Sequence, residues 1–465
     1  MTDLGLRSAT ELLASLDAGE ASSRELLDHL LARVEKHNPG VNAVVTLDAD
    51  RATEEAAAAD DARARGERLG PLHGLPMTVK DVMATAGLRT TSGSKEQADH
   101  VPSRDATSVA RLRAAGAVIF GKTNTPRYAA DLQTYNDVFG ITRNPWALDR
   151  TTGGSSGGSA AALAAGLTPL ELGTDIAGSI RNPSHMCGVF GHKPSYGIVP
   201  ADGYVSGLPL ENVASDVNVI GPLARSVRDL RLALDVLGGA GGGDAAGWHL
   251  DLPPARNAGL GSYRIAAWLD DPAAPVDPEV GDVLQAAVER LREHGAHVAD
   301  AARPELDMTD AIRVFQTLLF AAMAPWLDES LGLGAYPHGD WLKVNGQRQG
   351  HRWAWARFFR AYDALLAPVL PVAAFPHDVA DNPLGMAGRT VPVAGAEVSH
   401  GDLIHWCGVF GVSYLPSTVV PAGRTPDGRP VGMQIVGPYL EDHTTLDLAA
   451  RISEVLGGFE APPGY

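Results

Sequence analysis

Short apolar segments alternate with helical patterns along this chain, and that alternation limits its fold more than any other feature. The segments 77–80, 117–120 and 263–270 are short and mainly apolar. The stretches 22–38 and 278–295 repeat apolar residues at helical spacing. This order predicts an α/β protein with one large twisted sheet, mixed but mostly parallel, covered by helices on both faces.

The glycine-rich stretch 238–247 is the candidate domain boundary. A chain of 465 residues can form several domains or one large layered structure. Because strand and helix patterns resume after this stretch, we interpret it as a loop between two halves of a single domain that spans residues 1–465.

Charge and cysteine content exclude several classes of protein. The net charge of −17 argues against nucleic-acid binding and against binding to anionic membranes, since both need clustered Lys and Arg. Cys187 and Cys407 lie far apart without CxxC spacing, so we expect no disulfide framework, no metal site and no cofactor. The chain shows neither an apolar run of about 18 residues nor a secretory leader pattern, which predicts a cytoplasmic protein.

The segment GAVIFGKT, at 116–123, matches the phosphate-loop pattern GxxxxGK[ST]. A phosphate loop needs small, flexible residues whose amides wrap the anion between a strand and a helix. The four middle residues, Ala117 to Phe120, are themselves typical of a strand. We therefore interpret this match as accidental.

A second glycine-rich stretch, GGSSGG at 153–158, places Ser155 and Ser156 each at the centre of a GxSxG pattern. An α/β-hydrolase carries its nucleophile in such a pattern, between a strand and a helix. The residues before Gly153 are typical of a loop, so a plain Gly/Ser linker is the alternative. The stretch 159–175 that follows predicts a helix of small residues, whose first amides would attract an anion.

A third turn, GTDIAGSIRNPS at 173–184, carries Ser179 with no histidine shortly before it. A nucleophilic serine needs a group that takes its proton. Lys80 ends the apolar segment GLPMTVK and, taken alone, reaches solvent or pairs with Asp81. In a dry site, however, desolvation favours the neutral amine, which can act as a base.

Together these motifs resemble the amidase signature family of serine hydrolases. The resemblance rests on PLHGLPMTVKD, RTTGGSSGGSAAALAAG and LGTDIAGSIRNPS, and continues through GVFGHKPSYGIVP, VIGPLARSVRDL and VPAGRTPDGRPVGMQIVGP. The spacing also agrees, since Ser155 follows Lys80 by 75 residues and Ser179 follows Ser155 by 24. The resemblance covers most of the chain.

The resemblance implies a catalytic mechanism without histidine. Ser179 would be the nucleophile, Ser155 the proton relay and Lys80 the base, with a cis peptide bond between Gly154 and Ser155. Attack on an amide would form an acyl-enzyme that water then hydrolyses. The implied oxyanion hole consists of the backbone amides of Ile176, Ala177, Gly178 and Ser179, and the implied supporting residues are Ser156, Asp175 and Arg181. For Asp175 and Arg181, an ordinary surface ion pair is the alternative.

Two positions depart from the family pattern. Ala177 stands where relatives usually carry glycine, and Ser184 stands where they often carry alanine. We expect Ala177 to keep an ordinary backbone conformation and to narrow the pocket with its methyl group. We expect Ser184 to be harmless.

The resemblance does not select a substrate, because family members cleave aliphatic and aryl amides, fatty amides, ureas, carbamates and esters. The aromatic residues of the chain favour an apolar or aryl amide. Tyr135 and Trp406 are candidate pocket residues, with core packing as the alternative for each. The partner would be this small molecule, and the resemblance allows a homodimer.

Three other functions stay open at this point. The first is the glutaminase (A) subunit of a tRNA-dependent amidotransferase, which has the same catalytic residues and works with partner subunits. The second is an α/β-hydrolase, which would need a histidine instead of Lys80. The third is an inactive binding module, against which the intact lysine and serines argue.

Overall fold

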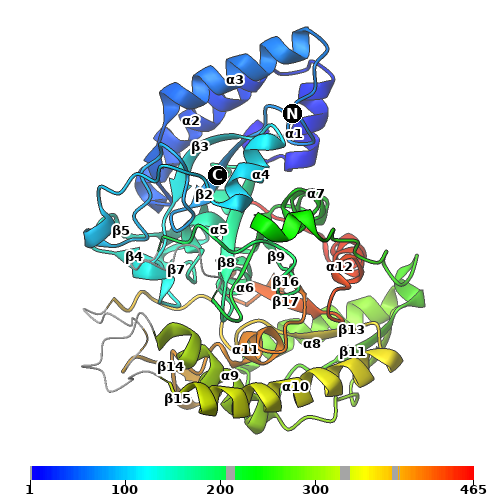
Figure 1. Ribbon diagram of the computed structural model, residues 1–465. Helices are drawn as coiled ribbons and strands as arrows, with labels where there is room; N and C mark the ends of the chain where they lie inside the picture. Colours follow the sequence, from blue (N-terminus) through cyan, green and yellow to red (C-terminus); the bar gives the residue numbers. More distant parts are fainter. Residues whose placement is uncertain (1–2, 206–214, 325–335, 380–385, 387) are drawn as a thin grey trace.

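The computed structural model describes residues 3–205, 215–324, 336–379, 386 and 388–465. An eleven-stranded sheet runs through the molecule in the order β1-β3-β2-β8-β10-β9-β16-β17-β13-β11-β12 (Figure 1). Its strands are β1 (Val44–Leu47), β2 (Pro76–Lys80), β3 (Val118–Thr123), β8 (Leu170–Asp175), β9 (Phe190–Lys193), β10 (Val219–Ala224), β11 (Arg264–Ala267), β12 (His297–Ala299), β13 (Ala364–Pro368), β16 (Ser417–Arg424) and β17 (Pro430–Val436).

The large mixed sheet is confirmed, and its parallel strands form two groups. The neighbours β3, β2 and β8 run parallel to one another, as do β13, β11 and β12. The remaining ladders of the described sheet are antiparallel. Strands from both sides of the loop 238–247 belong to this one sheet, since β10 precedes the loop and β11 follows it.

Helices cover both faces of the sheet, as expected. They are α1 (Ala9–Asp17), α2 (Ser23–Val41), α3 (Ala49–Ala64), α4 (Thr107–Ala114), α5 (Gly157–Ala164), α6 (Arg181–Cys187), α7 (Val227–Leu237), α8 (Pro278–Glu293), α9 (Met308–Met323), α10 (His338–Ala361), α11 (His405–Gly411) and α12 (Asp442–Leu456). In the part of the chain that the structure describes, no helix is long and apolar enough to cross a membrane.

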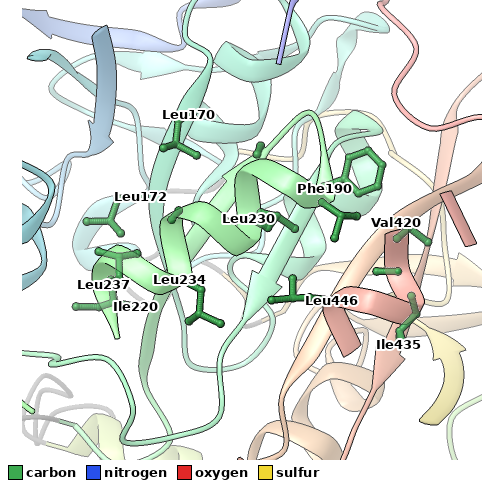
Figure 2. Packing of buried hydrophobic residues seen from close by; sticks show 14 of the residues in the cluster. Leu170, Leu172, Phe190, Ile220, Leu230, Leu234, Leu237, Val420, Ile435 and Leu446 are labelled. Carbon is green, nitrogen blue, oxygen red and sulfur yellow. The ribbon is translucent and has the colours of Figure 1, made fainter. Parts of the chain in front are cut away.

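The central strand β8 separates two layers of helices. Leu170 and Leu172 point to one layer, where they pack in the core with α7 (Figure 2). Gly173 points to the other layer, because a side chain at this position would meet Ser156 and Ile180 beside α5 and α6. The alternate direction of side chains along a strand therefore gives β8 one apolar face and one face towards the serine-bearing turns.

Part of the larger apolar core lies between the sheet and α7. Ser226 caps this helix by accepting a hydrogen bond from the Asp229 amide, and the apolar residues after it recur at helical spacing. Leu230 and Leu234 pack with Ile220 of β10 in this core (Figure 2). Each buried leucine contributes about 1.5–3 kcal/mol to folding, so this contact fixes α7 firmly on the sheet.

Two sequence predictions of local structure had different outcomes. The helix expected over 159–175 is wrong in its second half, since α5 ends at Ala164 and β8 begins at Leu170. Gly166 explains the break, because it has a positive φ of +67° just after the C-cap Ala165, where a glycine in this conformation ends a helix. The phosphate-loop match is indeed accidental: β3 includes Lys122, whose amine donates to the Met83 carbonyl at 2.6 Å.

Candidate active site

The parallel strands β2 and β8 bring three polar side chains to one edge of the sheet. Lys80 is the last residue of β2, and Ser179 lies in the turn that joins β8 to α6. Ser155 lies just before α5, which packs on both strands. In α/β sheets, sites form beyond the carboxyl ends of parallel strands, and this one follows that rule.

Lys80 is completely buried at the centre of this site. Its Nζ lies 2.7 Å from the Ser155 hydroxyl and 2.8 Å from the Thr174 hydroxyl. Burial lowers the pKa of Lys80 to about 7, although the charges of Asp175 and Glu171 oppose this shift. The alternative of a lysine that reaches solvent is therefore wrong, and a large share of the amine is neutral near pH 7.

Asp81 does not pair with Lys80, although it follows it in sequence. Its carboxylate accepts hydrogen bonds from the Thr91 amide and from the Thr91 hydroxyl. Its strongest charge interaction is with Lys122. The sequence alternative of a Lys80–Asp81 pair is therefore wrong.

The peptide bond between Gly154 and Ser155 is cis, as the resemblance implies. The Ser155 carbonyl accepts a hydrogen bond from the Thr125 hydroxyl at 3.0 Å. A side chain at Gly154 would lie 2.5 Å from the Asp131 carbonyl oxygen. Glycine is therefore needed at this position to let the two loops approach each other.

Ser156 connects the serine loop, residues 153–158, to the turn 173–184, which carries the proposed nucleophile Ser179 and is called the nucleophile turn below. Its amide donates to the Ser179 carbonyl at 3.1 Å. Its hydroxyl lies 3.4 Å from both the amide and the carbonyl oxygen of Thr174. These bonds hold Ser155 and Ser179 on facing loops, which fits a supporting role for Ser156.

Asp175 organises the turn that carries Ser179. Its carboxylate accepts hydrogen bonds from the amides of Gly178 at 2.7 Å, Ile180 at 3.1 Å and Arg181 at 3.3 Å. The carboxylate also satisfies amides at the start of α6, which lack partners within the helix. The turn therefore takes its shape from one charged side chain.

The oxyanion hole expected from the resemblance is wrong in one member. The Gly178 amide donates to the Asp175 carboxylate and is not available to a substrate oxygen. The amides of Ile176, Ala177 and Ser179 have no acceptor among the described residues. Three amides, rather than four, can therefore point towards a developing oxyanion.

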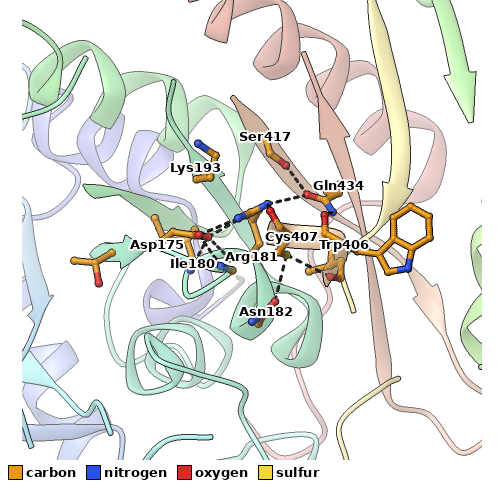
Figure 3. Close-up of polar contacts among 12 residues, drawn as sticks. Asp175, Ile180, Arg181, Asn182, Lys193, Trp406, Cys407, Ser417 and Gln434 are labelled. Atoms are coloured by element: carbon orange, nitrogen blue, oxygen red, sulfur yellow. Dashed lines mark hydrogen bonds and ion pairs between the residues drawn. The ribbon is translucent and has the colours of Figure 1, made fainter. Parts of the chain in front are cut away.

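Asp175 and Arg181 form a fully buried ion pair, which excludes the ordinary surface pair (Figure 3). The guanidinium donates to the two carboxylate oxygens at 2.9 and 3.0 Å. The third guanidinium nitrogen, Nη1, donates to the Cys407 carbonyl at 2.9 Å and to Gln434 Oε1 at 3.2 Å. Burial alone would raise the pKa of Asp175, but the Arg181 charge outweighs it and holds this pKa at about 2.

Ala177 and Ser184 fit the turn without distortion. Ala177 keeps an ordinary backbone conformation, as expected, and the positive φ of +118° falls on Gly178 instead. The methyl group of Ala177 packs in an apolar cluster with Leu132 and others. Ser184 donates its hydroxyl to the carbonyl of Ile180, the residue before α6, at 2.8 Å, so its polar group is satisfied locally.

The family model for Amidase matches residues 25–333 and 327–446. The chain belongs to the amidase family. It is 35% identical to the A component of the glutamyl-tRNA(Gln) amidotransferase of Roseiflexus sp. (strain RS-1), over 98% of this chain and 97% of that protein. It is also 35% identical to the acylamidase of Rhodococcus erythropolis, again over 98% of this chain and 97% of the relative.

A solved structure extends this likeness to the fold of the amidase. A bacterial aryl acylamidase of the amidase signature family matches with a TM-score of 0.81 and 28% identity, over 97% of this chain and 96% of that one. The α/β fold and the family resemblance seen in the motifs are thus confirmed. The chain is a hydrolase that acts on C–N bonds, as predicted.

The Ser179 hydroxyl of this amidase lies at the surface of the site. The residue is 9% exposed, whereas Ser155 is 1% exposed. Within the described residues, the Ser179 hydroxyl makes no hydrogen bond. Hydrogen bonds between catalytic groups often form only when substrate binds. The absence of a hydrogen bond between Ser179 and Ser155 in the described structure is therefore compatible with a proton relay.

The two candidate pocket aromatics lie in different surroundings. Trp406 is 1% exposed, donates its ring N–H to the Ala274 carbonyl at 3.0 Å and packs edge-on against Trp268. Trp406 is therefore a core residue, and its prediction as a pocket residue is wrong. Tyr135 is half-buried beside Arg389, whose guanidinium carbon lies 5.9 Å from the ring centre.

The two cysteines of the amidase are buried and unpaired. Burial raises the pKa of the Cys407 thiol to about 12, so this group is inert at neutral pH. Among the residues that the structure describes, no group of three or more His, Cys, Asp or Glu side chains is placed to hold a metal ion.

Thr174 and Glu171 are two functional candidates that the sequence analysis did not find. Thr174 is a hydrogen-bond partner of Lys80, and Glu171 is one of the two acids whose charge acts on it. Both lie in the stretch 159–175, which the sequence analysis interpreted as a helix. A strand prediction there, paired with β2, would have placed Glu171 opposite Thr78 and on the same face as Lys80.

Proposed function

We propose that this amidase cleaves an amide bond through an acyl-enzyme, with Ser179 as nucleophile, Ser155 as relay and Lys80 as base. The observation that carries the proposal is the 2.7 Å contact between the Lys80 amine and the Ser155 hydroxyl. This contact is buried, and in the described structure no carboxylate lies within ion-pair distance of the amine. A neutral lysine in such surroundings is a competent base.

The proposed reaction proceeds by two proton transfers along the relay. Lys80 takes the proton of Ser155 while Ser155 takes that of Ser179, whose oxygen bonds to the carbonyl carbon. The oxyanion then lies on the three unpaired amides of the turn, each worth about 3 kcal/mol to the transition state. Collapse breaks the C–N bond as Ser155 returns a proton to the leaving amine. Water repeats the sequence and releases the acid.

The preferred substrate that we propose is an apolar or aryl amide, with esters and carbamates as further substrates. Ile176 and Ala177 of the nucleophile turn belong to an apolar cluster that also contains Leu132, Leu318 and Phe375. An acyl group attached to Ser179 would therefore lie beside apolar side chains, whose burial favours binding. Tyr135 remains a proposed pocket residue.

Hydrolysis of p-nitroanilide, p-nitrophenyl ester and carbamate substrates tests this function. Wild-type activity that disappears in both Ser179→Ala and Lys80→Ala supports the lysine mechanism. Activity that survives Lys80→Ala unchanged contradicts it and points to a different base. The ranking of the three substrate types gives the preferred bond.

A second candidate is the glutaminase component of a tRNA-dependent amidotransferase, which works with partner subunits. The 35% identity to such a component over almost the whole chain supports this alternative. Release of ammonia from glutamine only when partner subunits are present would favour it. Hydrolysis of aryl amides by the isolated protein would favour a self-sufficient amidase.

A further inference from the structure

Glu171 of β8 is a buried acid that the proposed mechanism does not use. It is 1% exposed, and its carboxyl group accepts hydrogen bonds from neutral hydroxyls. Thr78 donates to one oxygen and Thr123 donates to the other at 3.2 Å. The Ser159 hydroxyl of α5 lies 2.9 Å from the Thr123 hydroxyl and so borders this group. In the described structure, no lysine or arginine lies within ion-pair distance of Glu171, so its charge has no direct partner.

The pairing of β2 with β8 places Glu171 close to Lys80. Thr78 lies opposite Glu171 in this parallel ladder. Lys80 lies two residues beyond Thr78, and side chains two apart in a strand point to the same face. Gly173 lies two residues beyond Glu171, and a side chain at this position would meet the Ser156 hydroxyl, so this face of β8 is the one towards the serine loop. The acid and the base thus share one face of two adjacent strands.

Few other charged groups act on this pair. Asp175 acts on Lys80 from the end of β8, and Lys122 acts on Glu171 from β3. The helix α5, which covers this face, has the sequence GGSAAALA and contains no ionisable residue. Asp175 stays ionised beside its arginine partner over the whole working range, so its effect on Lys80 is constant.

Burial acts on the two groups in opposite directions. It raises the pKa of Glu171 to about 7 and lowers that of Lys80 to about 7. Lys122 differs because its strongest charge interaction is with Asp81. Glu171 and Lys80 therefore change their protonation in the same pH range, and the charge of Glu171 acts on Lys80.

We propose that Glu171 is a positioning residue of the amidase reaction, which shares one proton with Lys80 and thereby sets the strength of that base. The proposal rests on the proposed role of Lys80. The uncharged form of the pair, with COOH on Glu171 and NH₂ on Lys80, has the same number of protons as the form with COO⁻ and NH₃⁺. The first form contains the free base that the relay needs. The second stabilises the lysine ammonium inside a dry site.

The test is Glu171→Gln, which keeps the size of the side chain and removes its charge. Two rates are measured from about pH 5 to about pH 9, a range that brackets the titration of a general base. One is amide hydrolysis, and the other is the covalent labelling of Ser179 by a fluorophosphonate probe. Without the carboxylate, Lys80 loses its proton more easily but is a weaker base. The acidic limb of the pH–rate profile, where the rate rises with pH, is therefore expected to move to lower pH by about half a unit or more. The rate on the plateau above it is expected to fall several-fold.

Asp229→Asn is the matched control, since it makes the same chemical change in another buried acid. Asp229 accepts hydrogen bonds from the amides of Ala9 and Thr10 and does not act on Lys80. Its acidic limb should coincide with that of the wild type. A folded Glu171→Gln protein whose limb also coincides with the wild type would overturn the proposal and leave Glu171 as a simple acceptor of hydroxyl bonds.

Thr78→Val serves if Glu171→Gln does not fold. It keeps the shape of the side chain but removes one hydroxyl donor to the Glu171 carboxyl and no charge, so the carboxylate is disfavoured and a smaller shift in the same direction is expected. An unchanged acidic limb in Thr78→Val overturns the proposal in that case. Failure of the proposed function has a different signature: the wild type would not be labelled at Ser179, or Lys80→Ala would be labelled as fast as the wild type.

Discussion

The Asp175 carboxylate accepts the amide hydrogen of Gly178 at 2.7 Å, and this bond determines the shape of the nucleophile turn. Gly178 has a φ of +118°, which side chains rarely allow. A Cβ atom here would lie 2.5 Å from the Asn182 amide oxygen. The turn therefore depends on an acid at its start and a glycine just before Ser179.

Gly178→Ala should disable the turn. Both the positive φ and the contact with Asn182 must be relieved by a backbone shift, and a small misplacement of a nucleophile costs about a hundredfold in rate. Steady-state kinetics with a p-nitroanilide measures this loss. Gly346→Ala in α10 is the control, since that glycine has free space, and stability there should rise by about 0.5–1 kcal/mol. Full activity in Gly178→Ala would contradict the strain argument.

Asp175→Asn should destabilise the whole protein. It leaves the buried Arg181 guanidinium without a counter-charge, which typically costs about 3–5 kcal/mol. Urea unfolding gives this loss directly as a lower free energy of unfolding. Asp28→Asn removes an exposed partner of Arg24 and should change stability by no more than about 0.5 kcal/mol. Equal effects of the two substitutions would show that the buried pair stabilises the protein no more than the exposed pair does.

The rate of acylation should rise with pH through about 7. Burial lowers the pKa of Lys80 to about 7, so the amine is protonated and inactive below this value and free above it. The dependence of kcat/KM on pH measures where this rise occurs. Lys80→Arg should be inactive at every pH, because a guanidinium keeps its proton in proteins. Retained activity with the same limb in Lys80→Arg would identify another base.

Lys80→Met should stabilise the protein while it abolishes activity. The pKa of Lys80 is 10.5 in the unfolded chain and about 7 in the fold, so between these values the unfolded state binds more protons and the stability of the wild type rises with pH. The cost of the lysine is thus largest below about pH 7. Thermal unfolding near pH 6 should show a melting temperature a few degrees higher in the variant, about 1 °C for each kcal/mol in a chain of this length.

That difference should shrink towards pH 10. A lower melting temperature of Lys80→Met at pH 6 would show that the contacts to Ser155 and Thr174 outweigh the cost of burying the amine.

The motifs predicted which segments form the site, but not how their atoms are paired. The three segments with Lys80, Ser155 and Ser179 were identified from sequence, and the structure places them at one sheet edge. The engagement of the Gly178 amide could not be predicted, because it depends on the exact path of a turn. Trp406 was misassigned because composition does not reveal the direction of a side chain.

Strand register is the other information that the sequence lacks. Glu171 and Thr174 matter because β8 pairs with β2 in one particular register. The misread stretch 159–175 begins as a helix of small residues, and apolar periodicity did not reveal the change to a strand within it. The buried hydroxyls around Glu171 come from three elements distant in sequence, and only tertiary contacts bring them together.

The hydrogen bonds that Arg181 donates to the last part of the chain have a consequence for the synthesis of the protein. Its guanidinium donates to the Cys407 carbonyl and to Gln434, which lie more than 200 residues later in the chain. A nascent or truncated polypeptide that ends before residue 400 already carries the proposed catalytic side chains, yet it lacks these two acceptors. The hydrogen bonds of Arg181 can therefore be completed only after the last part of the chain has been synthesised.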